Sequence, residues 1–203
     1  IVVRQEASTF RIENRASEEI AIIAEVESPP LSAIAEVLNH ESVNLYAEHL
    51  LKELGLQFRG RGTGSAGIEV LYSFLNEAGV DTRGFFIEDG SGLSPLNAVT
   101  ARGLTDLLLY MKNKAANPEA FINSLPEAGK EGTLKNTFRR PEFSNRLKAK
   151  SGSITRTRCY AGYFTAGSGR EMAFSIMINN YSGSSQAVIA GIEALLLETI
   201  EKH

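Results

Sequence analysis

Cysteine is almost absent from this sequence, and it has neither a long apolar run nor an excess of basic residues. A single cysteine among 203 residues, Cys159, excludes an internal disulfide and a cysteine-rich metal site. No apolar run approaches the ~18 residues that a membrane helix needs. The net charge of −3 leaves no basic stripe that could displace counterions from a nucleic acid. DNA and RNA are therefore not expected partners.

Two enzyme signatures are missing as well. No serine has glycine both two positions before it and two positions after it, which excludes the nucleophile elbow of the α/β-hydrolases. The histidines His40, His49 and His203 lack the spacing of a metalloprotease zinc site. We interpret His40 and His49 as surface or helix-packing residues, and we expect no metal ion and no cofactor.

The composition that remains, 43% hydrophobic and 22% charged, is typical of a globular domain with a substantial core. Apolar alternation in 158–165 and 172–178, with a turn at 167–169, predicts an antiparallel hairpin. Helical spacing after Ser184 predicts a terminal helix packed on that sheet. The other predicted elements are a strand at 19–26, a short strand at 84–88, and helices at 31–39, 42–55, 70–75, 104–111 and 121–125. The predicted class is α/β with an antiparallel sheet.

The glycine-rich segment 62–67 matches the Gly-x-Gly-x-x-Gly fingerprint of dinucleotide sites. That fingerprint needs a buried strand directly before it, whereas 53–61 is interrupted by glycines and arginines. We interpret 62–67 as a turn that begins a helix, with a nucleotide site as the less favoured alternative.

The stretch 147–154 carries the residues most suggestive of chemistry. Lys150 supplies a compact positive charge, the hydroxyls of Ser151 and Ser153 suit a carboxylate, and Gly152 would let a ligand lie against the backbone. These residues fit the wall of an acyl-transfer site. On these residues alone an ordinary solvated strand is the favoured interpretation, because Lys-Ser-Gly is a common tripeptide.

A family resemblance emerges from the order of three motifs. Ser42-Val43-Asn44, the loop 89–94 (Asp-Gly-Ser-Gly-Leu-Ser) and Lys150-Ser151-Gly152 follow one another as in the D-alanyl-D-alanine carboxypeptidases/endopeptidases, the class C penicillin-binding proteins. The chain resembles this family from about Ile22 onward. Two of its motifs, Ser-x-Asn and Lys-Thr-Gly, are present, with Ser151 in place of threonine. The nucleophile motif is missing, since no serine is followed three residues later by lysine.

The resemblance implies a β-lactamase/transpeptidase-like α+β fold, with an antiparallel sheet flanked by helices, that is incomplete in this chain. In the family the nucleophile precedes inserted domains, and the C-terminal half returns to complete the transpeptidase-like domain. We therefore expect 1–20 to be the tail of an inserted domain with a hinge. Residues 21–203 would be the C-terminal part of the penicillin-binding domain.

The resemblance also implies roles for particular residues. Ser42 would relay a proton to the leaving amine, Asn44 would hold the substrate amide or the family's base lysine, and Lys150 would supply a positive field.

For the substrate, Ser151 and Ser153 would hold the terminal carboxylate, and the N–H of Ser153 would form half of an oxyanion hole. Gly152 would leave room for the substrate backbone, and Leu93 would line the pocket for the acyl side chain.

The implied function is that of a serine-type D-alanyl-D-alanine carboxypeptidase/endopeptidase of the periplasm or cell envelope, inactive in this chain alone because the nucleophile is missing. Its partners would be peptidoglycan peptides ending in D-Ala-D-Ala, and β-lactams in the full-length parent. The alternative is a non-catalytic peptidoglycan-binding or scaffold domain of the same fold.

A further expectation concerns association. The apolar residues Ile22, Ile23, Phe174, Ile176 and Ile178 lie in strands that need cover on both faces. If an N-terminal half normally covers these faces, they are left uncovered here, and we expect self-association, a rearrangement of the termini that fills the groove, or a bound N-terminal fragment.

Overall fold

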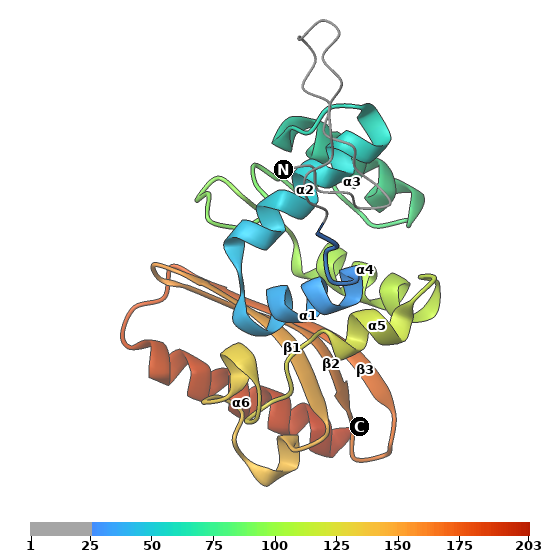
Figure 1. Cartoon of the computed structure of the whole chain (residues 1–203). Helices are drawn as coiled ribbons and strands as arrows, with labels where there is room; N and C mark the ends of the chain where they lie inside the picture. The colour runs from blue at the N-terminus through green and yellow to red at the C-terminus, as the bar shows by residue number, and fades with distance from the viewer. Residues whose placement is uncertain (1–25) are drawn as a thin grey trace, which may run out of the picture.

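The computed structural model describes residues 26–203, and its centre is a three-stranded antiparallel sheet (Figure 1). The strands are β1 (Leu147–Ile154), β2 (Thr157–Thr165) and β3 (Glu171–Asn179), in the order β1-β2-β3. The predicted hairpin of β2 and β3 is confirmed. Helices lie on both faces of the sheet, which confirms the predicted mixture of helices with an antiparallel sheet.

One face of the sheet carries the main core. Tyr160 and Phe164 alternate along β2 onto the same face, where they join Phe174 of β3. The terminal helix α6 (Ser185–Lys202) covers them with Ile192, Leu196 and Ile200. The hydroxyl of Ser184 begins this helix by accepting the N–H of Ala187 at 3.2 Å, so the predicted terminal helix is confirmed.

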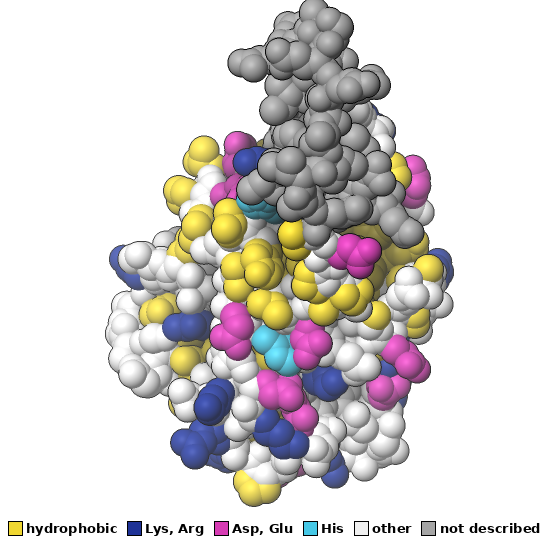
Figure 2. Space-filling view, in the orientation of Figure 1, with side chains coloured by type: hydrophobic (Ala, Val, Ile, Leu, Met, Phe, Trp, Pro, Cys, Tyr) yellow, Lys and Arg dark blue, Asp and Glu magenta, His cyan; other side chains and the backbone are white. Residues whose placement is uncertain are grey.

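The cover that α6 provides overturns part of the association argument. Phe174 is 8% exposed, and Ile176 and Ile178 are partly buried against the same cluster. These side chains were expected to be left uncovered, and that expectation is wrong because a helix from the same chain packs over them. The exposed apolar side chains lie elsewhere. In Figure 2 they gather over the region that α1 and α2 occupy in Figure 1, where Leu31, Val37 and Leu45 are exposed.

The opposite face of the sheet packs against α4 (Ala101–Asn113) and the short α5 (Pro118–Asn123). Tyr163 of β2 lies between them, and its hydroxyl donates to the carbonyl of Leu108 at 2.7 Å. α4 was predicted from its leucine spacing and is confirmed. α5 lies earlier than predicted: it begins at Pro118 and ends at Asn123, and the buried Leu125 follows it in the turn before Pro126.

The first helices are α1 (Leu31–Glu41), α2 (Asn44–Arg59) and α3 (Gly64–Glu77). α2 and α3 form a layer above one end of the sheet, whereas α1 lies beside α5 (Figure 1). The prediction that Gly55 ends the second helix is wrong, because α2 continues to Arg59 and ends at Gly60, which has φ 66°.

The α2–α3 contact explains the glycines of this layer. A Cβ on Gly67 would lie 1.9 Å from the carbonyl oxygen of Leu51, so α3 can approach α2 only with glycine at this position. Thr63 accepts the N–H of Ala66 and begins α3, and the element before it is a helix instead of a strand. The interpretation of 62–67 as a turn that begins a helix is therefore confirmed.

The connecting segments contain little regular structure. The predicted strand at 84–88 is wrong: Phe86 pairs with Ala98 in one isolated bridge, and the N–H of Glu88, two residues further on, donates to the side chain of Asn97. Between α5 and β1 lie two short 3-10 turns, η1 (Gly132–Leu134) and η2 (Pro141–Phe143).

The predicted strand at 19–26, the tail 1–20, and Ile22 and Ile23 lie outside the described residues, apart from Val26, which is not in a strand. Between residues 26 and 203, the helices are all too short or too polar to cross a membrane.

Candidate active site

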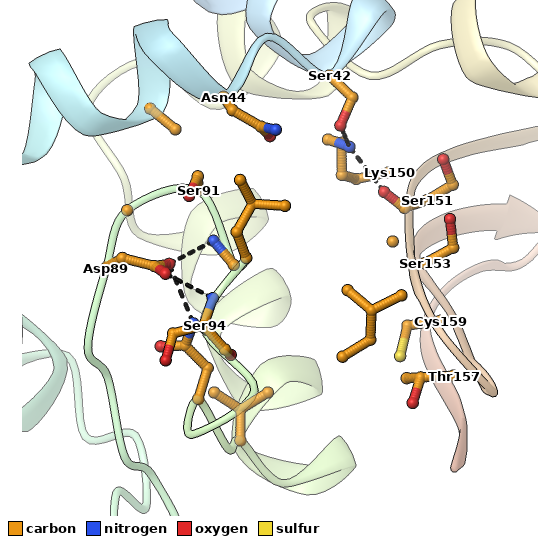
Figure 3. Close-up of a pocket in the computed structure, with 18 of the residues that line it drawn as sticks. Ser42, Asn44, Asp89, Ser91, Ser94, Lys150, Ser151, Ser153, Thr157 and Cys159 are labelled. Atoms are coloured by element: carbon orange, nitrogen blue, oxygen red, sulfur yellow. Dashed lines mark hydrogen bonds between the residues drawn. The ribbon is translucent and has the colours of Figure 1, made fainter. Parts of the chain in front are cut away.

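A cavity of about 730 Å³ lies between the loop 89–97 on one side and β1 on the other, below the corner where α1 meets α2 (Figure 3). The residues predicted to form the site all line this cavity: Ser42, Asn44, Leu93, Lys150, Ser151, Gly152 and Ser153. The chain thus brings together groups from three segments that are far apart in the sequence.

A hydrogen bond beside the cavity joins Lys150 to Ser42, 108 residues away. The Lys150 Nζ donates to the Ser42 Oγ at 2.7 Å and to the carbonyl of Ser151 at 2.6 Å (Figure 3). Burial lowers the pKa of Lys150 from its usual value, since a desolvated ammonium is less stable than a hydrated one. No carboxylate within 26–203 forms an ion pair with it. Its positive charge is therefore available to an anion that enters the cavity.

Ser42 reaches Lys150 because of an unusual backbone conformation. It has φ 55° and ψ 52°, in the left-handed region, and its N–H bonds the carbonyl of Leu38 at the end of α1. A non-glycine residue in this region costs roughly 1 to 3 kcal/mol. The conformation turns the chain sharply between α1 and α2 and points the hydroxyl at the cavity (Figure 3).

Asn44 is the first residue of α2 and is exposed to the cavity. In Figure 3 its amide points into the space between Ser42 and Ser91 of the opposite loop. No hydrogen bond of its side chain to another described residue is present, so the amide is free to bind a peptide group.

On β1, the Ser151 hydroxyl donates to the Thr133 hydroxyl of η1 at 2.8 Å. A Cβ added to Gly152 would meet nothing closer than the Cβ of Cys159 at 3.8 Å, so the backbone there borders open space. Ser153 is exposed at the same rim. Hydroxyls and an accessible strand backbone therefore lie beside the ammonium of Lys150.

The opposite wall is the loop 89–97, which Asp89 holds together. Its carboxylate accepts the N–H of Gly92 at 2.6 Å, the N–H of Ser94 at 2.7 Å and the amide of Asn97 at 3.0 Å (Figure 3). Partial burial acts to raise the pKa of Asp89, but these hydrogen bonds to the ionised form outweigh it and the net pKa is lowered. Leu93, at the tip of this loop, is 59% exposed and lines the cavity.

Sequence reasoning missed three contributors. Thr133 orients Ser151, Asp89 supports the loop, and Glu48 of α2 accepts two of the loop's N–H groups. The Asp-Gly-Ser-Gly-Leu-Ser motif was visible in the sequence, but its contact with Glu48 spans 42 residues and the contact of Ser151 with Thr133 spans 18, too far to be identified from spacing. Cys159 also lines the cavity, and burial raises the pKa of its thiol, which disfavours the nucleophilic thiolate.

The arrangement suits the recognition of an anionic peptide terminus. A partly buried ammonium that forms no ion pair with a carboxylate of residues 26–203, the hydroxyls near it and an exposed asparagine amide can bind a carboxylate and the peptide group beside it. The described part of the chain contains no group of three or more His, Cys, Asp or Glu side chains arranged to hold a metal ion.

Comparisons with known proteins identify the family of the chain. The sequence model of the D-Ala-D-Ala carboxypeptidase 3 (S13) family matches residues 8–198. A D-alanyl-D-alanine carboxypeptidase of Actinomadura sp. is 34% identical over 187 residues, which are 90% of this chain and 34% of that protein. The carboxypeptidase DacB of Mycolicibacterium smegmatis is 31% identical over 183 residues, 86% of this chain and 39% of that protein. The chain thus spans roughly a third of the length of these relatives.

Solved structures show the same fold. Penicillin-binding protein 4 (dacB) from Haemophilus influenzae, in complex with a β-lactam, aligns with a TM-score of 0.76 at 24% identity, over 84% of this chain and 41% of that one. A class A β-lactamase from Bacteroides cellulosilyticus aligns with a TM-score of 0.65 at 16% identity, over 85% of this chain and 64% of that one. These alignments confirm the predicted β-lactamase/transpeptidase-like class.

Proposed function

Because this chain belongs to the D-Ala-D-Ala carboxypeptidase 3 (S13) family, we propose that it is the C-terminal part of a serine-type D-alanyl-D-alanine carboxypeptidase/endopeptidase that acts on peptidoglycan stem peptides through an acyl-enzyme. The observation that carries this proposal is the hydrogen bond of 2.7 Å between Lys150 and Ser42 inside a cavity that Asn44 also lines. Two motifs of the family thereby meet at one point.

The proposed reaction uses a serine supplied by a segment outside this chain. Its hydroxyl attacks the carbonyl carbon between two D-alanines, the family's motif lysine takes the proton, and the C–N bond breaks. Ser42 passes a proton to the leaving amine, and Lys150, bonded to Ser42, keeps that hydroxyl oriented. Asn44 holds the substrate amide. Water then hydrolyses the acyl-enzyme and releases the shortened peptide.

The substrate's terminal carboxylate is assigned to the β1 side of the cavity. The hydroxyl of Ser153 donates a hydrogen bond to it, the hydroxyl of Ser151 does the same by turning away from Thr133, and the ammonium of Lys150 stabilises its charge. The open space beside Gly152 accommodates the substrate backbone, and the N–H of Ser153 serves as one donor of the oxyanion hole. Leu93 contacts the acyl side chain from the opposite wall.

The domain boundaries are part of the same proposal. Residues 1–20 would belong to the tail of an inserted domain and 21–203 to the penicillin-binding domain, whose nucleophile segment lies elsewhere. Support comes from the matched share of the relatives, 34% and 39%, and from the lack of a Ser-x-x-Lys motif among the 203 residues. The chain by itself would be inactive, and the assembled enzyme would work in the cell envelope.

Mass spectrometry with benzylpenicillin tests the proposal. The 203-residue chain should show no covalent adduct, whereas the longer protein of the parent reading frame should gain one penicillin at a serine of a Ser-x-x-Lys motif. A stoichiometric adduct on a serine of this chain would show that the nucleophile is misidentified.

The absence of a Ser-x-x-Lys motif from the 203 residues supports one alternative function, that of a non-catalytic peptidoglycan-binding or scaffold domain. A parent reading frame without Ser-x-x-Lys, together with binding of D-Ala-D-Ala peptides to the unmodified chain, would favour that function over the enzyme.

A further inference from the structure

Glu48 joins α2 to the loop that forms one wall of the cavity. Its Oε1 atom accepts the N–H of Gly90 at 3.0 Å and the N–H of Ser91 at 2.9 Å. Two successive N–H groups that converge on one carboxylate oxygen form a strong, charge-assisted contact. Among the described residues, the hydrogen bonds between loop 89–97 and α2 all end on this side chain.

The contact is also sterically close. A Cβ on Gly90 would lie 2.6 Å from the carbonyl oxygen of Ala47 and 3.1 Å from the Cβ of Leu51. The loop therefore rests directly on the helix backbone next to Glu48, and a side chain at position 90 would push it away.

The loop is held together from within, because the Asp89 carboxylate accepts the N–H groups of Gly92 and Ser94. The attachment of this loop to α2 therefore determines the positions of Ser91 and Leu93. Both residues line the cavity opposite β1, so this attachment also sets the width of the cavity.

Glu48 lies four residues after Asn44 on the same helix, so both side chains are on one face of α2. The helix that carries the Asn44 amide therefore also binds, through Glu48, the loop on the opposite side of the cavity. Ser91 stands next to Asn44 across the cavity in Figure 3.

We propose that Glu48 is a positioning residue of this active site. It sets the distance between the loop that carries Ser91 and Leu93 and the helix that carries Asn44. This distance determines how tightly the acyl part of the substrate binds. The proposal rests on the proposed function for its catalytic consequence. The attachment itself does not depend on it, and the two can be tested separately.

Amide hydrogen exchange on the 203-residue chain tests the attachment. Glu48→Ala should raise the exchange rates of the Gly90 and Ser91 amides by at least about tenfold, the effect expected when a hydrogen bond to a charged group is lost. Glu48→Gln keeps an acceptor oxygen and should raise them less. Glu77→Ala, which removes an exposed carboxylate at the end of α3, is the matched control and should leave them unchanged. Unchanged rates in Glu48→Ala would overturn the attachment.

Kinetics on the longer enzyme test the consequence. Glu48→Ala should raise KM for a D-alanyl-D-alanine peptide roughly tenfold while kcat changes less than about threefold, and Glu48→Gln should restore most of the affinity. Gly90→Ala should reproduce the KM effect with the carboxylate intact, which separates loop position from helix stability.

An unchanged KM in Glu48→Ala, or a loss confined to kcat, would overturn the positioning role. A wild-type enzyme with neither peptide hydrolysis nor penicillin acylation would overturn the proposed function and this catalytic consequence, whereas the exchange rates would still decide the attachment.

Discussion

Replacing Lys150 by alanine in the longer enzyme should lower the rate of acylation by a β-lactam about 10- to 1,000-fold. The lower bound follows from the bond between the Lys150 ammonium and the Ser42 hydroxyl, because a hydrogen bond to a charged group contributes roughly 1.5 to 3 kcal/mol and each 1.36 kcal/mol is a factor of ten. The upper bound is the loss of about 10² to 10³ measured when one pre-organised electrostatic donor is removed.

The same substitution should hardly change stability. Burial lowers the pKa of Lys150, which means that folding desolvates its ammonium at a cost, and this cost partly offsets the two hydrogen bonds it donates. We expect the free energy of unfolding of the 203-residue chain to change by no more than about 1 kcal/mol in Lys150→Ala. A large loss of activity without a matching loss of stability is typical of a site residue.

Lys150→Arg provides the second comparison. The lysine nitrogen fits between Ser42 and the carbonyl of Ser151, at 2.7 and 2.6 Å, and a planar guanidinium is too large to occupy the same point. The arginine variant should therefore restore little of the acylation rate, although it keeps the charge.

Stopped-flow measurement with a chromogenic β-lactam, beside chemical denaturation of the same variants, decides the matter. An acylation rate of Lys150→Ala within threefold of the wild-type rate would refute this reasoning. Lys150 would then be an ordinary solvated strand residue. A drop in stability as large as the drop in activity would refute it too.

Three further predictions concern the 203-residue chain. Folding lowers the pKa of Asp89, so its contribution to stability is present above its ordinary pKa of 3.8 and is lost as the pH falls toward the lowered value. When the urea midpoint of unfolding is plotted against pH, Asp89→Asn should therefore show a smaller decrease at acid pH than the wild type. An equal decrease in both would contradict this. In denaturant titrations, Gly67→Ala should lower the free energy of unfolding by about 1 to 3 kcal/mol, since the added Cβ would clash with the Leu51 carbonyl. Gly191→Ala, on an open surface of α6, should raise it by up to about 1 kcal/mol. Sedimentation equilibrium should show self-association through the exposed apolar side chains of α1 and α2, and a monomer at all concentrations would contradict it.

The sequence by itself determined the elements whose signals are local. The alternation of β2 and β3 predicted the hairpin, Ser184 and the spacing after it predicted α6, and the pattern of leucines predicted α4. Motif order also identified the residues that line the cavity, because a family resemblance carries spatial information that spacing lacks.

Tertiary structure decided the rest, and the reason is that long-range contacts override local signals. Gly55 resembled a helix end, but it lies within α2, where its glycine is needed because a Cβ there would lie 2.8 Å from the backbone nitrogen of Gly67 in α3. The stretch 84–88 had the composition of a strand, yet it found a single bridging partner and a side-chain acceptor in place of a neighbouring strand.

The site shows the same division. Ser42 and Lys150 could be named from the sequence, but their contact across 108 residues depends on the left-handed turn at Ser42 and the position of β1. Glu48 carried no signal at all, since a glutamate on a helix is ordinary until a loop 42 residues later places two N–H groups on its carboxylate. Residue types thus determined the available chemistry, and packing between distant segments decided which of those groups meet.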